Sequence, residues 1–144
     1  MKNFQKVLTN IIQETSNIFW VLFKVILPVI IVIRALELLG VIPYLAKFLD
    51  PLTSFIGIDG SLGLVWMAAI LVNIYAGMAA FASLQPIFDY TVAETTILGL
   101  IILIAHSLPI EVAIAQKSRV SGIFNLLFRF INAVIAGKIL SPGS

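Results

Sequence analysis

The chain has 144 residues, of which 60% are hydrophobic and 11% charged, and its mean hydropathy is +1.10. This composition excludes an ordinary soluble domain and indicates an integral membrane protein in contact with the lipid bilayer. The net charge of +2 is spread without a basic block, which argues against nucleic acid as a partner, and the chain has no cysteine and one histidine, so we expect no metal and no cofactor.

The length allows about four membrane crossings at about 20 residues each, within a single domain. We predict an all-α fold of about four spanning helices together with broken or half-length helices. The expected crossings are residues 17–39, 62–81, 93–107 and 121–140. The expected division is a helix over 1–16, a membrane domain over 17–140 and a tail over 141–144.

Residues 1–16 have apolar positions at intervals of three and four. These positions are Phe4, Val7, Leu8, Ile11 and Ile12. Lysine, asparagine, glutamine and glutamate occupy the opposite face, so the pattern predicts an amphipathic helix at the membrane interface. The alternative is that this segment extends the first span.

The first span, residues 17–39, contains charged residues within an apolar run. Lys24 is close enough to one end for its amine to reach the headgroups. Arg34 and Glu37 are three residues apart on one helix and can form an ion pair. The alternative is that Arg34 reaches a polar cavity.

Residues 40–60 are interrupted by prolines and glycines and do not fit one spanning helix. We expect a half-length helix from Pro43 to Leu49, a turn at Asp50 and Pro51, and a second short helix ending near Gly57.

Residues 62–81 form a strongly apolar run with many alanines and Gly77, which favour close helix packing. Asn73 lies in the middle of this run. An asparagine at mid-span is typical of an interhelical hydrogen bond, and the alternative is a contact with a solute.

The stretch Ala105–Glu111 follows a long apolar run and contains the single histidine, His106, together with Ser107, Pro109 and Glu111. Pro109 has no N–H and disfavours helical dihedrals at the preceding residue, so we expect a helix break near Ser107 and a new helix with Pro109 in its first turn. Glu111 would then lie near the positive end of that helix. Broken helices inside membranes require protein or water to satisfy the backbone, and transporters use them as binding sites.

The helix leading to this break has a narrow face spaced at three and four residues. The face consists of Thr95, Gly99, Ile102 and His106. We interpret it as the polar side of that helix.

The last span, residues 121–140, has a stripe of polar and small residues at the same spacing. The stripe consists of Gly122, Asn125, Arg129, Asn132 and Ala136. An unpaired guanidinium at mid-depth is costly, so we predict that Arg129 pairs with a carboxylate. The candidate partners are Glu111, Glu94 and Glu37.

The run from Leu103 to Glu111, followed by Arg129 and Asn132, resembles the nucleoside recognition or gate domain. Related segments occur in bacterial ferrous-iron permeases, concentrative nucleoside transporters and small proteins that include the spore maturation pair. The helix around Asn73 and Gly77 is similar as well, and the resemblance covers roughly residues 20–140. In the nucleoside transporters, two such units form inverted repeats whose broken helices enclose the substrate, whereas this chain contains one unit.

The resemblance implies substrate-binding residues at the break and on the facing span. They are His106, Ser107, Pro109, Glu111 and Asn73. We expect a transport-type protein of the bacterial inner membrane that binds a small polar solute or a cation, with Glu111 or Glu94 as the coupling group. The alternative is a structural or regulatory membrane subunit. An enzyme is not expected, because the HExxH and GxSxG motifs are absent.

We also expect a homo-oligomer, specifically a dimer. With four crossings, Lys2, Lys6 and Lys138 lie on one side and Lys47, Lys117 and Arg119 on the other. This balance gives no preferred orientation, so an antiparallel dimer would recreate an inverted repeat from two copies. A parallel dimer is the alternative.

Overall fold

The structure is a computed structural model that describes residues 2–119 and 121–141. This part of the chain folds into seven α-helices without strands, and three of its segments are long and apolar enough to cross a membrane. The helices are α1 (Lys2–Leu38), α2 (Ile42–Phe55), α3 (Gly60–Leu71), α4 (Ile74–Leu84), α5 (Val92–Ile104), α6 (Leu108–Lys117) and α7 (Gly122–Leu140). The predicted all-α membrane fold with broken and half-length helices is therefore confirmed.

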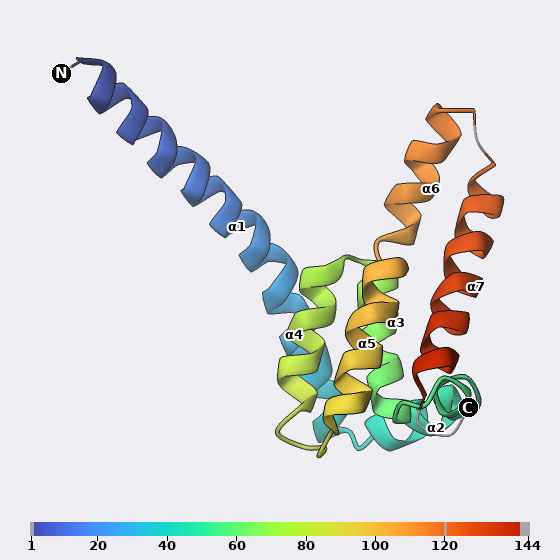
Figure 1. Ribbon diagram of the computed structural model, residues 1–144. Helices are drawn as coiled ribbons and strands as arrows, with labels where there is room; N and C mark the ends of the chain where they lie inside the picture. Colours follow the sequence, from blue (N-terminus) through green and yellow to red (C-terminus); the bar gives the residue numbers. More distant parts are fainter. Residues whose placement is uncertain (1, 120, 142–144) are drawn as a thin grey trace.

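Helix α1 is one continuous rod of 37 residues, about 55 Å long, which exceeds the bilayer core of about 30 Å. Its C-terminal part packs on α4 through residues such as Ile33, and its N-terminal part projects away from the bundle (Figure 1). The helix has no break at residue 16, so the segment before that residue continues the first span. The location of this segment at the membrane interface stays a prediction.

Helix α2 corrects the expected pair of short helices, because it continues through Asp50 and Pro51. Pro51 removes one backbone hydrogen bond, but the hydroxyl of Ser54 donates to the Asp50 carbonyl at 2.5 Å and that of Thr53 to the Leu49 carbonyl at 3.2 Å. Both bonds follow the helix axis past the proline, and the carbonyl that loses its amide donor is that of Lys47. The chain then bends by 90° into α3.

Helices α3 and α4 form an antiparallel hairpin, so the prediction of one span over 62–81 was wrong. A Cβ at Gly77 on α4 would overlap the Ala69 side chain on α3, which shows how closely the two helices pack. The turn forms because Asn73 caps α4, with its Oδ1 accepting from the Ala76 amide at 3.0 Å. Each helix is about 17 Å long and reaches only halfway through a bilayer.

Helices α5 and α6 together form one candidate span, Val92–Lys117, which is broken between residues 104 and 108 (Figure 1). The predicted interruption before Pro109 is thus confirmed, with Pro109 in the first turn of α6. Helix α7 returns alongside α6 and α5 and ends near α2.

Three segments of the described chain are long and apolar enough to cross a membrane, namely α1, α5 with α6, and α7, and the bent pair of α2 and α3 is a candidate for a fourth. Counted with three crossings, four cations share the side of the α6–α7 turn, with two on the other side. The four are Lys2, Lys6, Lys117 and Arg119, and the two are Lys47 and Lys138. The balance of three against three assumes four crossings, and both that balance and the orientation of the chain stay predictions.

Candidate functional site

The break between α5 and α6 lies near the middle of its span. Helix α5 extends about 20 Å to one side of it and α6 about 15 Å to the other. The tip of the α3–α4 hairpin ends on the same side of the bundle (Figure 1). The C-terminal ends of α3 and α5 and the N-terminal ends of α4 and α6 therefore meet at about the depth where transporters bind substrates.

The break is attached to α3 by two hydrogen bonds. The indole Nε1–H of Trp66 donates to the Ala105 carbonyl at 3.3 Å, and the Ser107 amide donates to the Ala69 carbonyl at 2.9 Å. Trp66 and Ala69 are three residues apart and share one face of α3. Trp66 is in turn stacked on Phe130 of α7, with ring centroids 5.3 Å apart, so α7 supports the residue that holds the break.

The break exposes the side chains of His106 and Ser107, which are half-buried. His106 Nδ1 lies 2.9 Å from the Ile102 carbonyl. Ser107 has a φ of +51°, a left-handed conformation that is unfavourable for a serine, and its hydroxyl makes no cap hydrogen bond to α6. Strained residues of this kind occur at binding sites.

Backbone acceptors gather where α3 and α5 end. In the described part of the chain, five carbonyls have no hydrogen-bond partner there. They belong to Ile70, Leu71, Val72, Leu103 and Ile104. The negative ends of the α3 and α5 dipoles meet the positive ends of the α4 and α6 dipoles there, so the break offers both backbone acceptors and backbone donors to a solute.

Asn73 lies at the tip of the hairpin and not at mid-span as expected. Its Oδ1 caps α4, which leaves the two amide hydrogens of its half-buried side chain available. Asparagine is a common N-cap residue, although the uninterrupted apolar run around Asn73 obscured this signal.

Glu111 turns away from the break and forms an ion pair with Arg129 of α7. Of the three candidate partners, Glu111 is the one that the structure brings to Arg129. Both residues, with Asn125, line an open groove of about 360 Å³ between α6 and α7. Pro109 is exposed on the first turn of α6.

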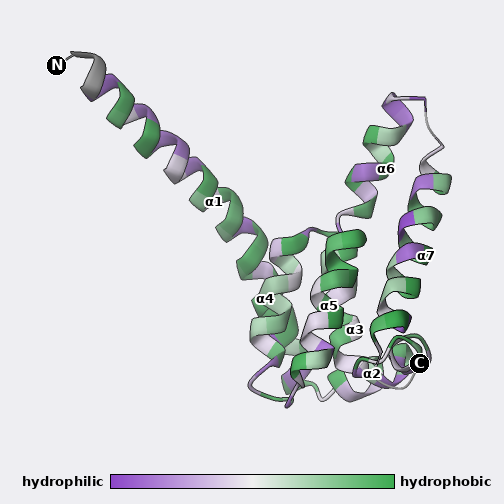
Figure 2. Ribbon diagram, in the orientation of Figure 1, coloured by the Kyte–Doolittle hydropathy of each residue, from purple (hydrophilic) through white to green (hydrophobic). Residues whose placement is uncertain are grey.

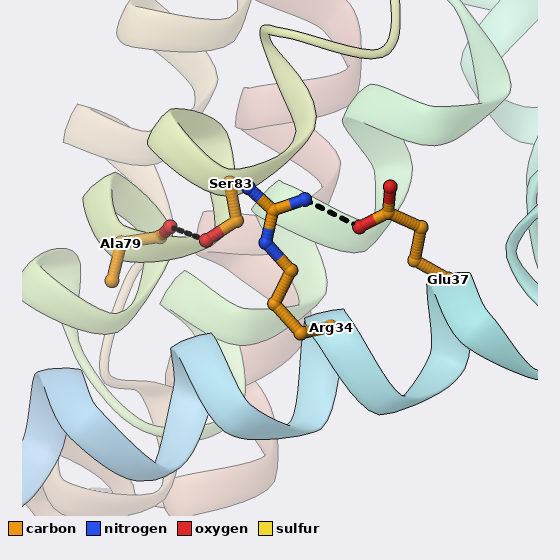
Figure 3. Close-up of polar contacts among 4 residues, drawn as sticks. All are labelled: Arg34, Glu37, Ala79 and Ser83. Carbon is orange, nitrogen blue, oxygen red and sulfur yellow. Dashed lines mark hydrogen bonds and ion pairs between the residues drawn. The ribbon is translucent and has the colours of Figure 1, made fainter.

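Three further candidate residues lie away from the break. Asn132 is exposed on α7, where its Nδ2 donates to the Phe128 carbonyl at 2.6 Å. Arg34 and Glu37 pair at 2.6 Å along α1, and Figure 3 shows the guanidinium extending towards Ser83 on α4.

Glu94 lies in the first turn of α5, at the end away from the break, and its role as a coupling group stays a prediction. Its carboxylate accepts from the Asp59 amide at 3.1 Å and from the amide and hydroxyl of Thr91 at 2.9 and 2.7 Å. Beside it, the hydroxyl of buried Ser61 bonds to Asp59 and lies 2.8 Å from the Tyr90 hydroxyl. Burial raises the pKa of Tyr90 above its usual value. We call Asp59, Ser61, Tyr90, Thr91 and Glu94 the polar clamp.

A groove of about 410 Å³ between α4 and α5 runs from the break towards the polar clamp. Ile74 and Ile102 line it near the break, and Phe81 and Thr95 line it near the clamp. The face of α5 that was interpreted as polar therefore lines a groove that is mostly apolar, as Figure 2 indicates for α4 and α5.

Sequence reasoning missed Trp66 and Ala69, which hold the break. A tryptophan in an apolar run carries one N–H that needs a partner, which was the available signal for Trp66. Ala69 contributes only its backbone carbonyl, and no side-chain pattern could have identified it.

Comparison with known proteins gives two matches. Residues 19–121 match the family called Gate, which is described as nucleoside recognition. An uncharacterised membrane protein of Bacillus subtilis (strain 168), YvoD, is 31% identical over 98 residues, which cover 68% of this chain and 30% of YvoD. The matched segment thus spans less than a third of that protein. No solved structure matches the chain.

Proposed function

This chain belongs to the nucleoside-recognition family called Gate, and from that premise we propose that it is one gate unit of a membrane transport protein. In this proposal a small polar solute, nucleoside-like, or a cation binds at the break between α5 and α6. Two copies enclose the site and expose it alternately to the two sides of the membrane.

The observation that carries the proposal is the hydrogen bond from the Ser107 amide to the Ala69 carbonyl, which joins the break between α5 and α6 to the last turn of α3, next to the α3–α4 turn. Each break frees backbone groups that lipid cannot satisfy. Uncovered backbone at this depth is tolerated where it lines a cavity or contacts protein. A binding site explains why both interruptions occur together.

A second copy is part of the proposal because one copy leaves the site open. The groove between α4 and α5 is uncovered at Gly99, where a Cβ would meet nothing within 4 Å. Within the part of the chain that the structure describes, the N-terminal part of α1 also packs on no other helix. Small residues such as Gly99 allow close approach of a helix from a partner.

The orientation of the copies can be measured with single cysteines at Gln5, Lys47 and Ser118, which are exposed. The three-crossing arrangement predicts that positions 5 and 118 are labelled from the cytoplasmic side of bacterial inner-membrane vesicles and position 47 from the other. Labelling of every position from both sides would instead support antiparallel copies. Labelling of 47 and 118 from the same side would contradict three crossings.

The alternative function is a structural or regulatory membrane subunit. It is favoured by the fact that several polar residues, such as Glu94 and Arg34, are satisfied within the chain. In that case the polar groups would only hold helices together.

Uptake of radiolabelled uridine into proteoliposomes tests the proposal. Wild type should exceed empty liposomes, and Asn73→Asp should lower uptake about tenfold, since aspartate keeps the helix cap but removes two donors. Asn132→Ala is the matched control, because Asn132 lies away from the break, and it should transport normally. Equal uptake by wild type and empty liposomes would favour the alternative.

A further inference from the structure

The groove between α4 and α5 has apolar walls. It holds about 410 Å³, a volume within the range of small-molecule sites in proteins, and its lining includes Val65, Ile74, Met78, Phe81, Leu98 and Ile102. Thr95 contributes a polar side chain, but its hydroxyl already donates to the Thr91 carbonyl at 3.0 Å. From Ile74 to Phe81 the groove follows about two turns of α4, a length of about 10 Å. The walls therefore suit an apolar body of this length.

One end of the groove reaches polar backbone groups at the break. Ile74 is the first residue of α4, and the three amides of residues 73–75 have no hydrogen-bond partner in the part of the chain that the structure describes. Ile102 on the opposite wall is followed by Leu103 and Ile104, whose carbonyls also lack partners among the described residues. Backbone donors and acceptors therefore lie together at this end of the groove, at about mid-depth.

Two other occupants of the groove would leave these backbone groups unsatisfied. A phospholipid keeps its headgroup about 15 Å from mid-depth, so its acyl chain would bring only a methyl end to the break. A helix of a second copy can cover the open side at Gly99, but its backbone is bonded internally and offers the break no hydrogen bonds. Unpaired polar groups at this depth cost free energy, which favours an occupant with a polar end at the break.

We propose that the groove and the break form one binding site for an amphiphile. Its apolar body, about 10 Å long, lies between α4 and α5, and its polar end carries both a hydrogen-bond donor and an acceptor and occupies the break. A primary amide on an alkyl chain of about eight carbons has this form, since such a chain is about 10 Å long when extended. The inference rests on the proposed function and adds the chemical class of the solute.

Two substitutions change the volume of the groove. Gly99→Leu places a side chain where a Cβ would meet nothing within 4 Å, and it should lower amphiphile binding about tenfold. Ala82→Leu adds volume near Phe81, at the end away from the break, and should shift the preferred alkyl chain to a shorter length. Ile123→Ala is the control, because Ile123 is 74% exposed on α7 and lies outside the groove. A shift in the preferred chain length is a readout that a loss of folding or of the second copy would not produce.

Photolabelling of the protein in detergent and in phospholipid nanodiscs tests the proposal. The probe is octanamide with a diazirine at the end of its alkyl chain, and mass spectrometry locates the label. We expect the label on α4 and α5 near Phe81 and Thr95, in both media. Unlabelled alkyl amides should protect these positions with an optimum at about eight carbons, and octane should not protect them.

Label spread evenly along α1 and α7, protection that does not depend on chain length, or equal protection by octane would overturn the inference. An unchanged optimum in Ala82→Leu would do the same. Labelling in detergent that is lost in nanodiscs would assign the groove to a phospholipid chain instead. Uridine uptake no greater than that of empty liposomes, together with the expected labelling, would overturn the proposed function and leave the groove as a ligand site.

Discussion

The two ends of the α3–α5 pair differ in how completely their polar groups are satisfied. At the N-terminal end, the polar clamp pairs the Glu94 carboxylate with three donors and buries the Ser61 hydroxyl between Asp59 and Tyr90. At the C-terminal end, carbonyls are left without partners in the described residues, and Ser107 adopts a left-handed conformation.

This difference indicates that the two ends of α3 and α5 have different roles. A cluster whose polar groups are all hydrogen-bonded stabilises a fold. Unpaired polar groups in a region of low dielectric cost free energy unless water, a solute or protein bonds to them. The clamp therefore holds the helices together. In the proposed function, the break leaves backbone groups available to a solute at a cost to stability.

The largest expected effect comes from Trp66→Ala, which removes both the stacking on Phe130 and the hydrogen bond to Ala105. We expect a loss of about 3–5 kcal/mol in the free energy of unfolding, together with loss of solute uptake. Thermal unfolding in detergent measures it. Trp20→Ala is the control, because Trp20 is 55% exposed, and an equal loss in both variants would contradict a role for Trp66 in the fold.

A smaller effect is expected from Arg129→Leu, which leaves the half-buried Glu111 carboxylate without its cation. The free energy of unfolding should fall by about 2 kcal/mol, less than for a fully buried pair. Adding Glu111→Gln should restore most of the loss, because the uncompensated charge disappears. A double variant no more stable than Arg129→Leu alone would show that the two residues do not act as a pair.

Tyr90→Phe tests the clamp itself. It removes the hydrogen bond to Ser61 and should lower the free energy of unfolding by about 1 kcal/mol without changing uptake. Burial raises the pKa of Tyr90, so the protonated hydroxyl gives its full stabilisation of the fold below the unfolded pKa of about 10. This stabilisation is lost as the pH rises through the higher pKa of the folded state. Tyr44→Phe is the control, since Tyr44 is 77% exposed. A change in solute uptake caused by Tyr90→Phe would contradict the view that the polar clamp stabilises the fold without taking part in transport.

The smallest effect is expected from Ser107→Gly, which relieves the left-handed backbone. The free energy of unfolding should rise by up to about 1 kcal/mol, partly offset by the flexibility of glycine in the unfolded chain. Ser107→Ala keeps the strain and should leave stability unchanged. Thermal unfolding of the two variants side by side gives the comparison, and equal stability would argue against strain at this position.

Local chemistry was sufficient to predict some features of this molecule. Pro109 has no backbone N–H, so its covalent structure alone predicts the helix break. The spacing of Arg34 and Glu37 by three residues on one helix predicts their ion pair. An uncompensated guanidinium at mid-depth also predicted a carboxylate partner for Arg129, although three candidates remained until the fold brought α6 to α7.

Other features depended on contacts between distant segments. Hydropathy over 62–81 is continuous, and the hairpin turn at Asn73 is stabilised by the packing of Gly77 on Ala69. Glu94 looked equivalent to Glu111 in the sequence, and only the bend after α2, which brings Asp59 to Glu94, assigns it to the clamp. Helix α2 continues through Pro51, which a reading of Asp50 and Pro51 as a turn did not anticipate.

The central claim is that the break is a polar site that water and solute reach. The chain has no cysteine, so Ser107→Cys provides one thiol at the break, and Leu103→Cys provides a control that is 65% exposed on α5. A charged, water-soluble thiol reagent should modify position 107 in membranes and not position 103, and uridine should slow the reaction at 107. An unreactive thiol at position 107, or equal rates at 103 and 107 that uridine leaves unchanged, would contradict the account.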